Sequence, residues 1–352
     1  MTENYKKSTV FTYYYTTNQS LWRAAPQTKS FARYAPSTFC LFLPERSVNL
    51  LKGYDMGATI SYKIFMATAT FNTSEYTVPG TNRTVYLKYL LCSQKDIVVR
   101  SISGSVKDSG YYGINGTFFR PGTTSLVGIA INDSAQIRNY GTMNRDPRIS
   151  DVTSPLPCGT FFYLKTPLTN ASGTRIFGGT DEIDVYDNHS YDGVTLTIAN
   201  TQFAIGGSSL FPSETSLTQN TFNIRMVNQD APYSGYRSRT AIVYIGGGSD
   251  DLNTVLLTIH GPVDNDKSSG NNYVTSDYAG VTLWELRTLI NDVFAPMIPS
   301  APETVVHAIA LDGGGSTQIA YKNSSGNKVT YQTADSYSSN NRPVYSMLSV
   351  PM

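Results

Sequence analysis

Short hydrophobic stretches, separated by Gly, Asn, Asp, Ser or Pro, run through most of the chain. Apolar and polar residues that alternate over roughly four to eight positions indicate strands with one buried face. We therefore expect a chain built mainly of strands. Before residue 261 the segments that we expect to be strands are 62–70, 85–91, 96–102, 126–131, 160–164, 194–199, 222–227, 239–245 and 254–259. Glycines and aspartates at 246–251 predict a hairpin between the last two of them.

One segment has the spacing of an amphipathic helix instead. Thr282 and Glu285 have the spacing of a capping box, in which each side chain satisfies a free backbone N–H group at the helix start. Pro296 follows the last turn and ends the pattern. We expect a helix over about 282–294. Its apolar face comprises Leu286, Leu289, Ile290, Val293 and Phe294.

These segments predict a β-rich α+β fold: one catalytic domain with mixed sheets and a few helices. Towards the C-terminus a short strand over 305–311 precedes a glycine-rich turn, and the next strand covers 317–321. Residues 1–55 are rich in Tyr, Thr, Ser and Arg and are interpreted as an N-terminal extension, and the domain as 56–352. The extension is expected to act as an arm through which copies of the chain, or parts of a virion, assemble.

Composition narrows the classes of partner. Charged residues make up 15% of the 352 residues, against roughly 25% in an average soluble protein, and the net charge is +1. The chain shows no basic stripe, so we expect no nucleic-acid partner. It has no apolar run near the ~20 residues that cross a bilayer, so we expect no membrane span. It also shows no apolar run of signal-peptide length. The composition still favours an extracellular or virion location, with a cytoplasmic one as the alternative.

Cysteine and histidine patterns give no metal or redox motif. Cys40, Cys92 and Cys158 lack C-x-x-C spacing, and we expect three buried, reduced side chains, with one disulfide plus a free thiol as the alternative. His189, His260 and His307 share no ligand spacing. We therefore expect neither a metal site nor a cofactor.

The stretch from Leu311 to Ser316 is the strongest candidate for chemistry. It reads Leu-Asp-Gly-Gly-Gly-Ser directly after a predicted strand. Glycines allow a ligand to approach the main chain, and successive amides in such a turn can surround an anion. Asp312 would add a carboxylate, and Ser316 a hydroxyl. The alternative for this stretch is an ordinary tight turn with a solvated aspartate.

Two further stretches carry polar groups beside strands. Asn115 precedes Gly116 and two phenylalanines, and it is either a turn residue or a two-way hydrogen bonder in a pocket. Arg239 and Thr240 begin an apolar strand. A guanidinium there can bind a phosphate through two hydrogen bonds, although most arginines are ordinary surface residues.

Taken in order, these stretches resemble the phosphodiester glycosidase family, whose animal member removes N-acetylglucosamine from a phosphodiester. The family resembles this chain in five motifs that span about residues 60–352. They are Asn-Gly-x-Phe-Phe at 115–119, Arg-Thr-Ala-Ile at 239–242, Gly-Val-Thr-Leu-x-Glu-Leu at 280–286, Leu-Asp-Gly-Gly-Gly-Ser at 311–316, and Arg-Pro-Val at 342–344.

The resemblance implies both the site and the reaction. The implied catalytic residues are Asp312, Asn115 and Arg239. The implied binding residues for phosphate or substrate are Thr240, Gly313, Gly314, Gly315, Ser316, Arg342 and His260. His260 stands where the family often has aspartate before glycine, and long insertions follow it. The chain is thus expected to be a hydrolase that cleaves the glycosidic bond of a sugar-1-phosphodiester.

The expected substrate is a phosphate-linked glycan: a glycoconjugate or a cell-wall or capsule polymer, attacked by a phage tail or virion component. The alternative is a non-catalytic structural module that binds carbohydrate or phosphate on a virion or cell surface, which His260 in place of aspartate favours. A third reading is an intracellular protein acting on a nucleotide-sugar or cyclic nucleotide with the same anion pocket.

Overall fold

A computed structural model gives the fold, and its chain divides into two units, Met1–Met66 and Ala67–Met352. All the residues that the structure describes lie in the second unit: 69–119, 122–138, 159–183, 186–229, 234–246, 252–261, 273–274, 280–297, 307–333 and 342–352. The predicted extension over 1–55, its boundary with the domain, and most of the predicted strand over 62–70 lie outside them.

The second unit contains a ten-stranded sheet, a six-stranded sheet and a two-stranded ribbon in the described ranges. The ten-stranded sheet runs in the order β1 (Thr70–Thr77), β2 (Thr84–Cys92), β13 (Thr254–His260), β12 (Arg239–Tyr244), β15 (His307–Ala310), β11 (Thr201–Ser209), β5 (Ala130–Asn132) and β6 (Ala135–Gln136). Two more strands branch from this path: β11 also pairs with β7 (Gly159–Thr169), and β7 pairs with β8 (Arg175–Glu182). The six-stranded sheet runs β14 (Tyr273–Val274), β17 (Lys328–Thr333), β16 (Gln318–Lys322), β4 (Tyr112–Asn115), β18 (Val344–Val350) and β3 (Val98–Gly104). The ribbon pairs β9 (His189–Tyr191) with β10 (Val194–Leu196).

The prediction of a β-rich fold with mixed sheets is confirmed. In the described residues the strand pairs are antiparallel except for β14 with β17, which is parallel. β12 and β13 are antiparallel neighbours, as expected for the hairpin around 246–251, although most of the turn itself lies outside the described residues. Antiparallel neighbours suit short connections, which is why so many brief strands fit into one unit.

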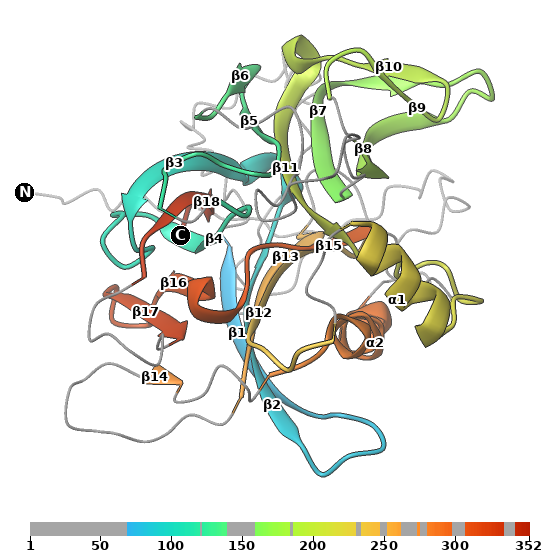
Figure 1. Cartoon of the computed structure of the whole chain (residues 1–352). Helices are drawn as coiled ribbons and strands as arrows, with labels where there is room; N and C mark the ends of the chain where they lie inside the picture. Colours follow the sequence, from blue (N-terminus) through green and yellow to red (C-terminus); the bar gives the residue numbers. More distant parts are fainter. Residues whose placement is uncertain are drawn as a thin grey trace, which may run out of the picture. The chain divides into compact units, whose positions relative to one another are not determined.

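Side chains from β12 and β13 alternate between two cores, because successive residues of a strand point to opposite faces. Ala241 and Val243 face the helices and pack in a cluster with Leu286 and Ile290. Ile242 faces the six-stranded sheet and packs in another cluster, together with Leu256, Ile114, Ile309, Ile319 and Leu348. Figure 1 shows the helices on one side of these central strands and the six-stranded sheet on the other. The middle of the large sheet is therefore buried on both faces.

Two α-helices occur in the described part of the chain, α1 (Gln219–Asn228) and α2 (Leu283–Phe294). The predicted helix over 282–294 is confirmed, with both hydrogen bonds of the capping box present between Thr282 and Glu285. Short 3-10 turns are η2 (Gln94–Asp96), η3 (Ile198–Asn200), η4 (Ala295–Met297) and η5 (Gly314–Ser316). None of the described helices combines the length and the apolar character needed to cross a membrane.

The expected strand over 222–227 is wrong, because this segment lies in α1. Its apolar residues alternate in the sequence, but the structure buries only Phe222 and Met226, which stand one helical turn apart. Ile224 and Val227 are exposed. Thr218 caps the helix start by accepting a hydrogen bond from the Thr221 amide. The segment over 194–199 is also only partly a strand, since η3 follows β10.

The capping box gives a stability prediction. Replacing Thr282 with alanine removes the acceptor for the Glu285 amide and should lower the free energy of unfolding by about 1 kcal/mol. Urea denaturation of Thr282→Ala beside Thr282→Ser measures this, since serine keeps the hydroxyl. Equal losses in both variants would contradict the capping role.

Candidate functional site

A pocket forms where β12 begins and β15 ends. These strands are antiparallel, and Ala241 pairs with Ala310. Continuing this register by two residues brings Arg239 opposite Asp312. Strand pairing thus brings the backbones of two predicted site residues, 73 positions apart in the sequence, opposite each other. The cavity has a volume of about 70 Å³ and is lined by Phe118, Ser208, Arg237, Arg239, Leu283, Ala310, Leu311, Asp312, Gly313 and Gly314.

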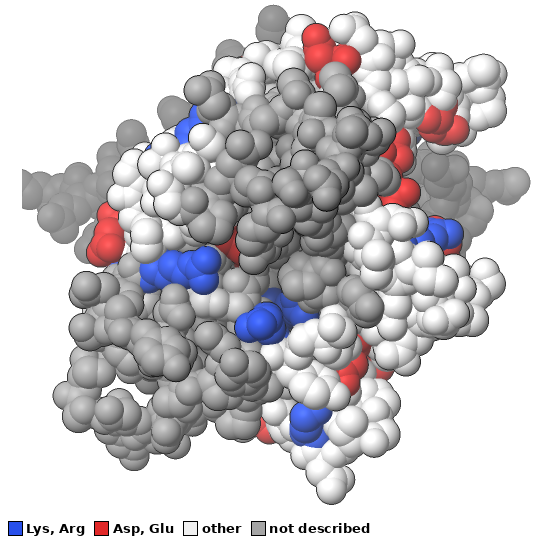
Figure 2. All heavy atoms as spheres, viewed as in Figure 1, with Lys and Arg blue, Asp and Glu red and all other residues white. Residues whose placement is uncertain are grey.

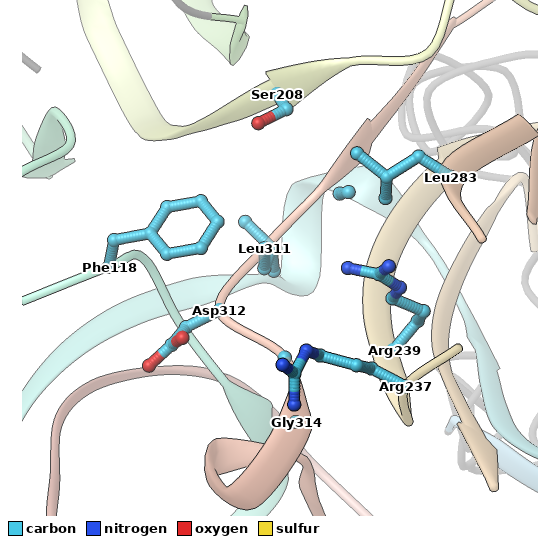
Figure 3. Close-up of a pocket in the computed structure, with 10 residues that line it drawn as sticks. Phe118, Ser208, Arg237, Arg239, Leu283, Leu311, Asp312 and Gly314 are labelled. Atoms are coloured by element: carbon cyan, nitrogen blue, oxygen red, sulfur yellow. The ribbon is translucent and has the colours of Figure 1, made fainter. Parts of the chain in front are cut away.

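Charged residues lie on opposite sides of this pocket. In Figure 3 the side chains of Arg237 and Arg239 lie on one side of Leu311, and Phe118 and Asp312 lie on the other. The Asp312 carboxylate points away from both guanidinium groups. The pocket therefore separates its positive and negative groups instead of pairing them.

Arg239 is deeply buried, with 3% of its surface exposed. Its Nε donates a hydrogen bond to the carbonyl of Val281 (2.9 Å), and its Nη2 donates to that of Gly235 (2.7 Å). Burial, and secondarily the charge of Arg237, lowers the pKa of Arg239 to about 10, and Glu285 acts in the opposite direction. At neutral pH the side chain remains a cation, held in place by main-chain oxygens.

Arg237 is a pocket residue that the sequence reasoning did not select. Its backbone forms a bridge with Val281, donating across 3.4 Å and accepting across 3.0 Å, and Gly280 packs beside it. A Cβ atom on Gly280 would lie 1.8 Å from the Arg237 carbonyl oxygen, so only glycine fits there. The i, i+2 spacing of Arg237 and Arg239 was the available signal, because such residues share one face of a strand.

Asn115 joins three distant segments and is fully buried. Its Nδ2 donates to the Asp312 carbonyl (2.7 Å). Its Oδ1 accepts from the Thr240 hydroxyl (2.8 Å) and from the Gln318 amide (2.9 Å). Asn115 and Thr240 therefore hold the glycine turn and β12 in place, and neither side chain lines the pocket.

The glycine turn uses most of its amide groups inside the fold. The Asp312 amide donates to Gly116, that of Gly314 to Ser238, that of Ser316 to Gly313 and that of Thr317 to Gly314. Gly314 has a φ of 58°, in the left-handed region that favours glycine. The expectation that successive amides of this turn surround an anion is thus not met by the geometry. The guanidinium groups of Arg237 and Arg239 are the donors that face the pocket.

Asp312 is a partly exposed carboxyl group whose pKa is raised to about 6. Loss of solvent is the main cause. The Ser316 hydroxyl, the charge of Arg342 and the Gly313 amide lower the pKa and limit the rise. The Ser316 hydroxyl is buried and makes no well-aligned hydrogen bond with the described residues, so its effect is that of a nearby dipole. Arg342 also lies over the Phe119 ring at 5.7 Å. A carboxyl with this pKa can exchange a proton near neutral pH.

Besides Asn115 and Thr240, four predicted site residues do not line the pocket: Gly315, Ser316, Arg342 and His260. Gly315 is buried within η5 and does not line the pocket. His260 is fully buried at the end of β13, where its Nε2 lies 3.1 Å from the Thr258 hydroxyl. Burial, and then the charge of Lys88, lowers the pKa of His260 to about 3, so the ring is neutral. The imidazole therefore does not take the place of a pocket carboxylate.

No cluster of metal-binding side chains appears among the described positions. Cys92 is a buried free thiol whose pKa is raised by burial. This agrees with the prediction for Cys92, while Cys40 and Cys158 lie outside the described residues.

Comparison with known proteins leaves the site to be interpreted from its own residues. No protein-family model matches the chain. No curated protein sequence matches it either. A hypothetical protein from Synechocystis matches with a TM-score of 0.39 and 14% identity over 80% of this chain and 62% of its own. A protein from Burkholderia pseudomallei K96243 matches with a TM-score of 0.29 and 13% identity over 82% of this chain and 58% of its own. The chain spans about three fifths of the length of these proteins.

The hydrogen bonds of Asn115 predict a structural role that can be measured. Asn115→Ala removes three hydrogen bonds, two of them buried and one partly buried, and should lower the free energy of unfolding by roughly 3 kcal/mol. Chemical denaturation measures the loss. Asn72→Ala is the control, because that amide bonds only to nearby Thr70 at the surface. A loss at Asn115 no larger than the control's would contradict this role.

Proposed function

We propose that this chain is a hydrolase that cleaves the glycosidic bond of a sugar-1-phosphodiester. The observation that carries the proposal is one pocket with two guanidinium groups on one side and a carboxyl group of pKa about 6 on the other. The motif resemblance to phosphodiester glycosidases points to the same reaction.

Arg237 and Arg239 are suited to a phosphodiester. That group carries a full negative charge at neutral pH, and planar guanidinium groups match its oxygens with pairs of donors. Main-chain carbonyls already fix Arg239, so little side-chain entropy is lost when an anion binds. A fixed positive group also stabilises the negative charge that develops on the leaving phosphate.

Asp312 is assigned the role of general base. A water molecule attacks the anomeric carbon, and its proton passes to the Asp312 carboxylate. The C1–O bond breaks, and its electron pair stays on the phosphate oxygen. The products are the free sugar and a phosphate monoester. A carboxylate in this place also stabilises positive charge on the sugar ring in the transition state.

One carboxyl group suffices for such a substrate. Most glycosidases use a second carboxylic acid to protonate a poor leaving group. A phosphate monoester leaves readily as an anion, and its second pKa is about 6. The positive charge of the arginines therefore assists departure of the leaving group, as the second carboxylic acid does in most glycosidases.

The substrate class that we propose is a phosphate-linked glycoconjugate or a cell-wall or capsule polymer. Low charge and a high content of Tyr, Gly, Ser, Thr and Asn favour a protein that works outside cells, as part of a phage tail or virion. Assembly through residues 1–55 belongs to the same proposal.

The second candidate is a non-catalytic module that binds a phosphate-linked sugar. Its support is the small volume of the pocket, about 70 Å³, together with the burial of His260 away from it. Binding of a sugar-1-phosphodiester without release of sugar by the wild-type chain would favour this candidate over the hydrolase.

The base role predicts how activity depends on pH. Because the carboxylate form is active, kcat/KM for a sugar-1-phosphodiester should rise about tenfold per pH unit below 6 and level off above it. Asp312→Asn should lower the plateau by at least about a hundredfold. The test measures released sugar from pH 4 to 8. Activity that instead falls above pH 6 would overturn the base assignment, and equal turnover by Asp312→Asn would overturn the role of Asp312.

Phosphate binding by Arg237 predicts a loss of kcat/KM when this residue is replaced. Arg237→Met should weaken kcat/KM for the phosphodiester by about a hundredfold, which corresponds to nearly 3 kcal/mol. Arg175→Met is the matched control, since Arg175 is an exposed residue of β8 outside the pocket. Equal activity of the two variants would contradict phosphate binding by Arg237.

A further inference from the structure

A second and larger pocket lies near the other end of β15. It is a groove of about 550 Å³, within the roughly 300–1,000 Å³ typical of small-molecule sites. Its walls come from the end of β8, the end of β11 and the loop after it, α1, and the start of β15. The lining residues are Thr180, Asp181, Glu182, Ser209, Phe211, Pro212, Ser213, Glu214, Arg225, Asn228, His307 and Ala308. None of them lines the first pocket.

Phe211 supplies an aromatic ring to this groove from an unusual backbone conformation. Its φ is 47°, in the left-handed region that bulky side chains rarely adopt. Arg225 lies over the ring at 4.6 Å from its centroid, and Arg287 donates to the Phe211 carbonyl across 3.2 Å. These contacts hold the ring in the groove wall despite the backbone cost.

Each of three carboxylates in the groove is fixed by a neighbour. Glu214 accepts from Arg225 (2.7 Å), Asp181 contacts the His189 ring (2.9 Å) and Glu182 accepts from the Gln229 amide (3.2 Å). A carboxylate can accept several hydrogen bonds, so each retains capacity for a ligand hydroxyl or amine. Figure 2 shows acidic side chains over the region of β8 and beside α1.

Buried polar groups complete the lining. Ser209 is 2% exposed. The Thr180 hydroxyl is buried and has no hydrogen-bond partner in the described part of the chain. Burial lowers the pKa of His307 to about 4, so its ring is neutral and presents one donor and one acceptor. A buried hydroxyl left without a partner, such as that of Thr180, costs free energy that a hydroxyl-bearing ligand would recover.

We propose that this groove binds a saccharide unit that carries no anionic group. An aromatic ring covers the apolar face of a sugar, while the fixed carboxylates and the neutral Ser209, Thr180 and His307 side chains exchange hydrogen bonds with its hydroxyls. Three carboxylates against one arginine disfavour a phosphate or uronic acid in this groove. The inference does not rest on the proposed reaction, because it concerns different residues and needs no chemistry at Asp312.

The test is binding of the full chain to an array of neutral, amino and anionic glycans, followed by titration calorimetry with the best ligand. Wild-type protein should bind neutral or amino glycans. Glu182→Gln and Phe211→Leu should each weaken binding by at least tenfold, with folding checked by thermal unfolding. Glu75→Gln, an exposed carboxylate of β1 outside the groove, should leave binding unchanged, and so should Asp312→Asn.

Three binding results with the wild-type chain would overturn the proposal. They are no glycan binding, a preference for anionic glycans, or tighter binding of the polyamine spermidine than of any sugar. Failure of Asp312→Asn alone to bind would place the sugar in the first pocket and would also count against this groove. Glycan binding that survives in both Glu182→Gln and Phe211→Leu would likewise count against this groove.

Discussion

One buried amide, that of Asn115, connects the two sheets at the point where the pocket forms. It reaches the Asp312 carbonyl, the Thr240 hydroxyl and the Gln318 amide, which belong to three separate segments. The bonds to Thr240 and Gln318 are buried and the bond to Asp312 is partly buried, so the Asn115 side chain must be satisfied within the protein. An apolar residue at 115 would leave these groups unpaired, and a charged one would be buried without a counterion. These hydrogen bonds thus fix the position of the glycine turn relative to the start of β12.

Near Asn115 the fold places two charged side chains, those of Arg239 and Asp312, where solvent is scarce. Arg239 keeps its charge because main-chain carbonyls surround it, and Asp312 gains a raised pKa because water is removed from it. Had the two side chains met directly, each would have neutralised the other and lowered the Asp312 pKa. Their placement on opposite sides of Leu311 keeps both available to a ligand.

The two pockets near β15 have opposite character. The first presents arginines, and the second presents carboxylates around an aromatic ring. A polymer with phosphate links and uncharged sugar units contains both kinds of group. If both proposals hold, the chain would distinguish such a polymer by charge at one pocket and by hydroxyl groups at the other.

Local physics explains what the sequence alone determined. Capping residues and the 3.6-residue period specified α2, and alternation specified most strands, because both signals depend on neighbours in the chain. The alternating residues of 222–227 misled because α1 buries only two of them, and tertiary packing decides which.

In the candidate site, too, the sequence determined some features and tertiary packing decided others. Asp312 and Arg239 could be selected from their sequence context, yet only the β12–β15 register brings them together. The part played by Asn115 and Thr240 behind the pocket, the participation of Arg237, the burial of His260 and the groove at Phe211 depend on contacts between residues far apart in the chain. Burial, and with it the pKa of Asp312, is a property of the assembled layers, since desolvation requires the surrounding segments to be in place.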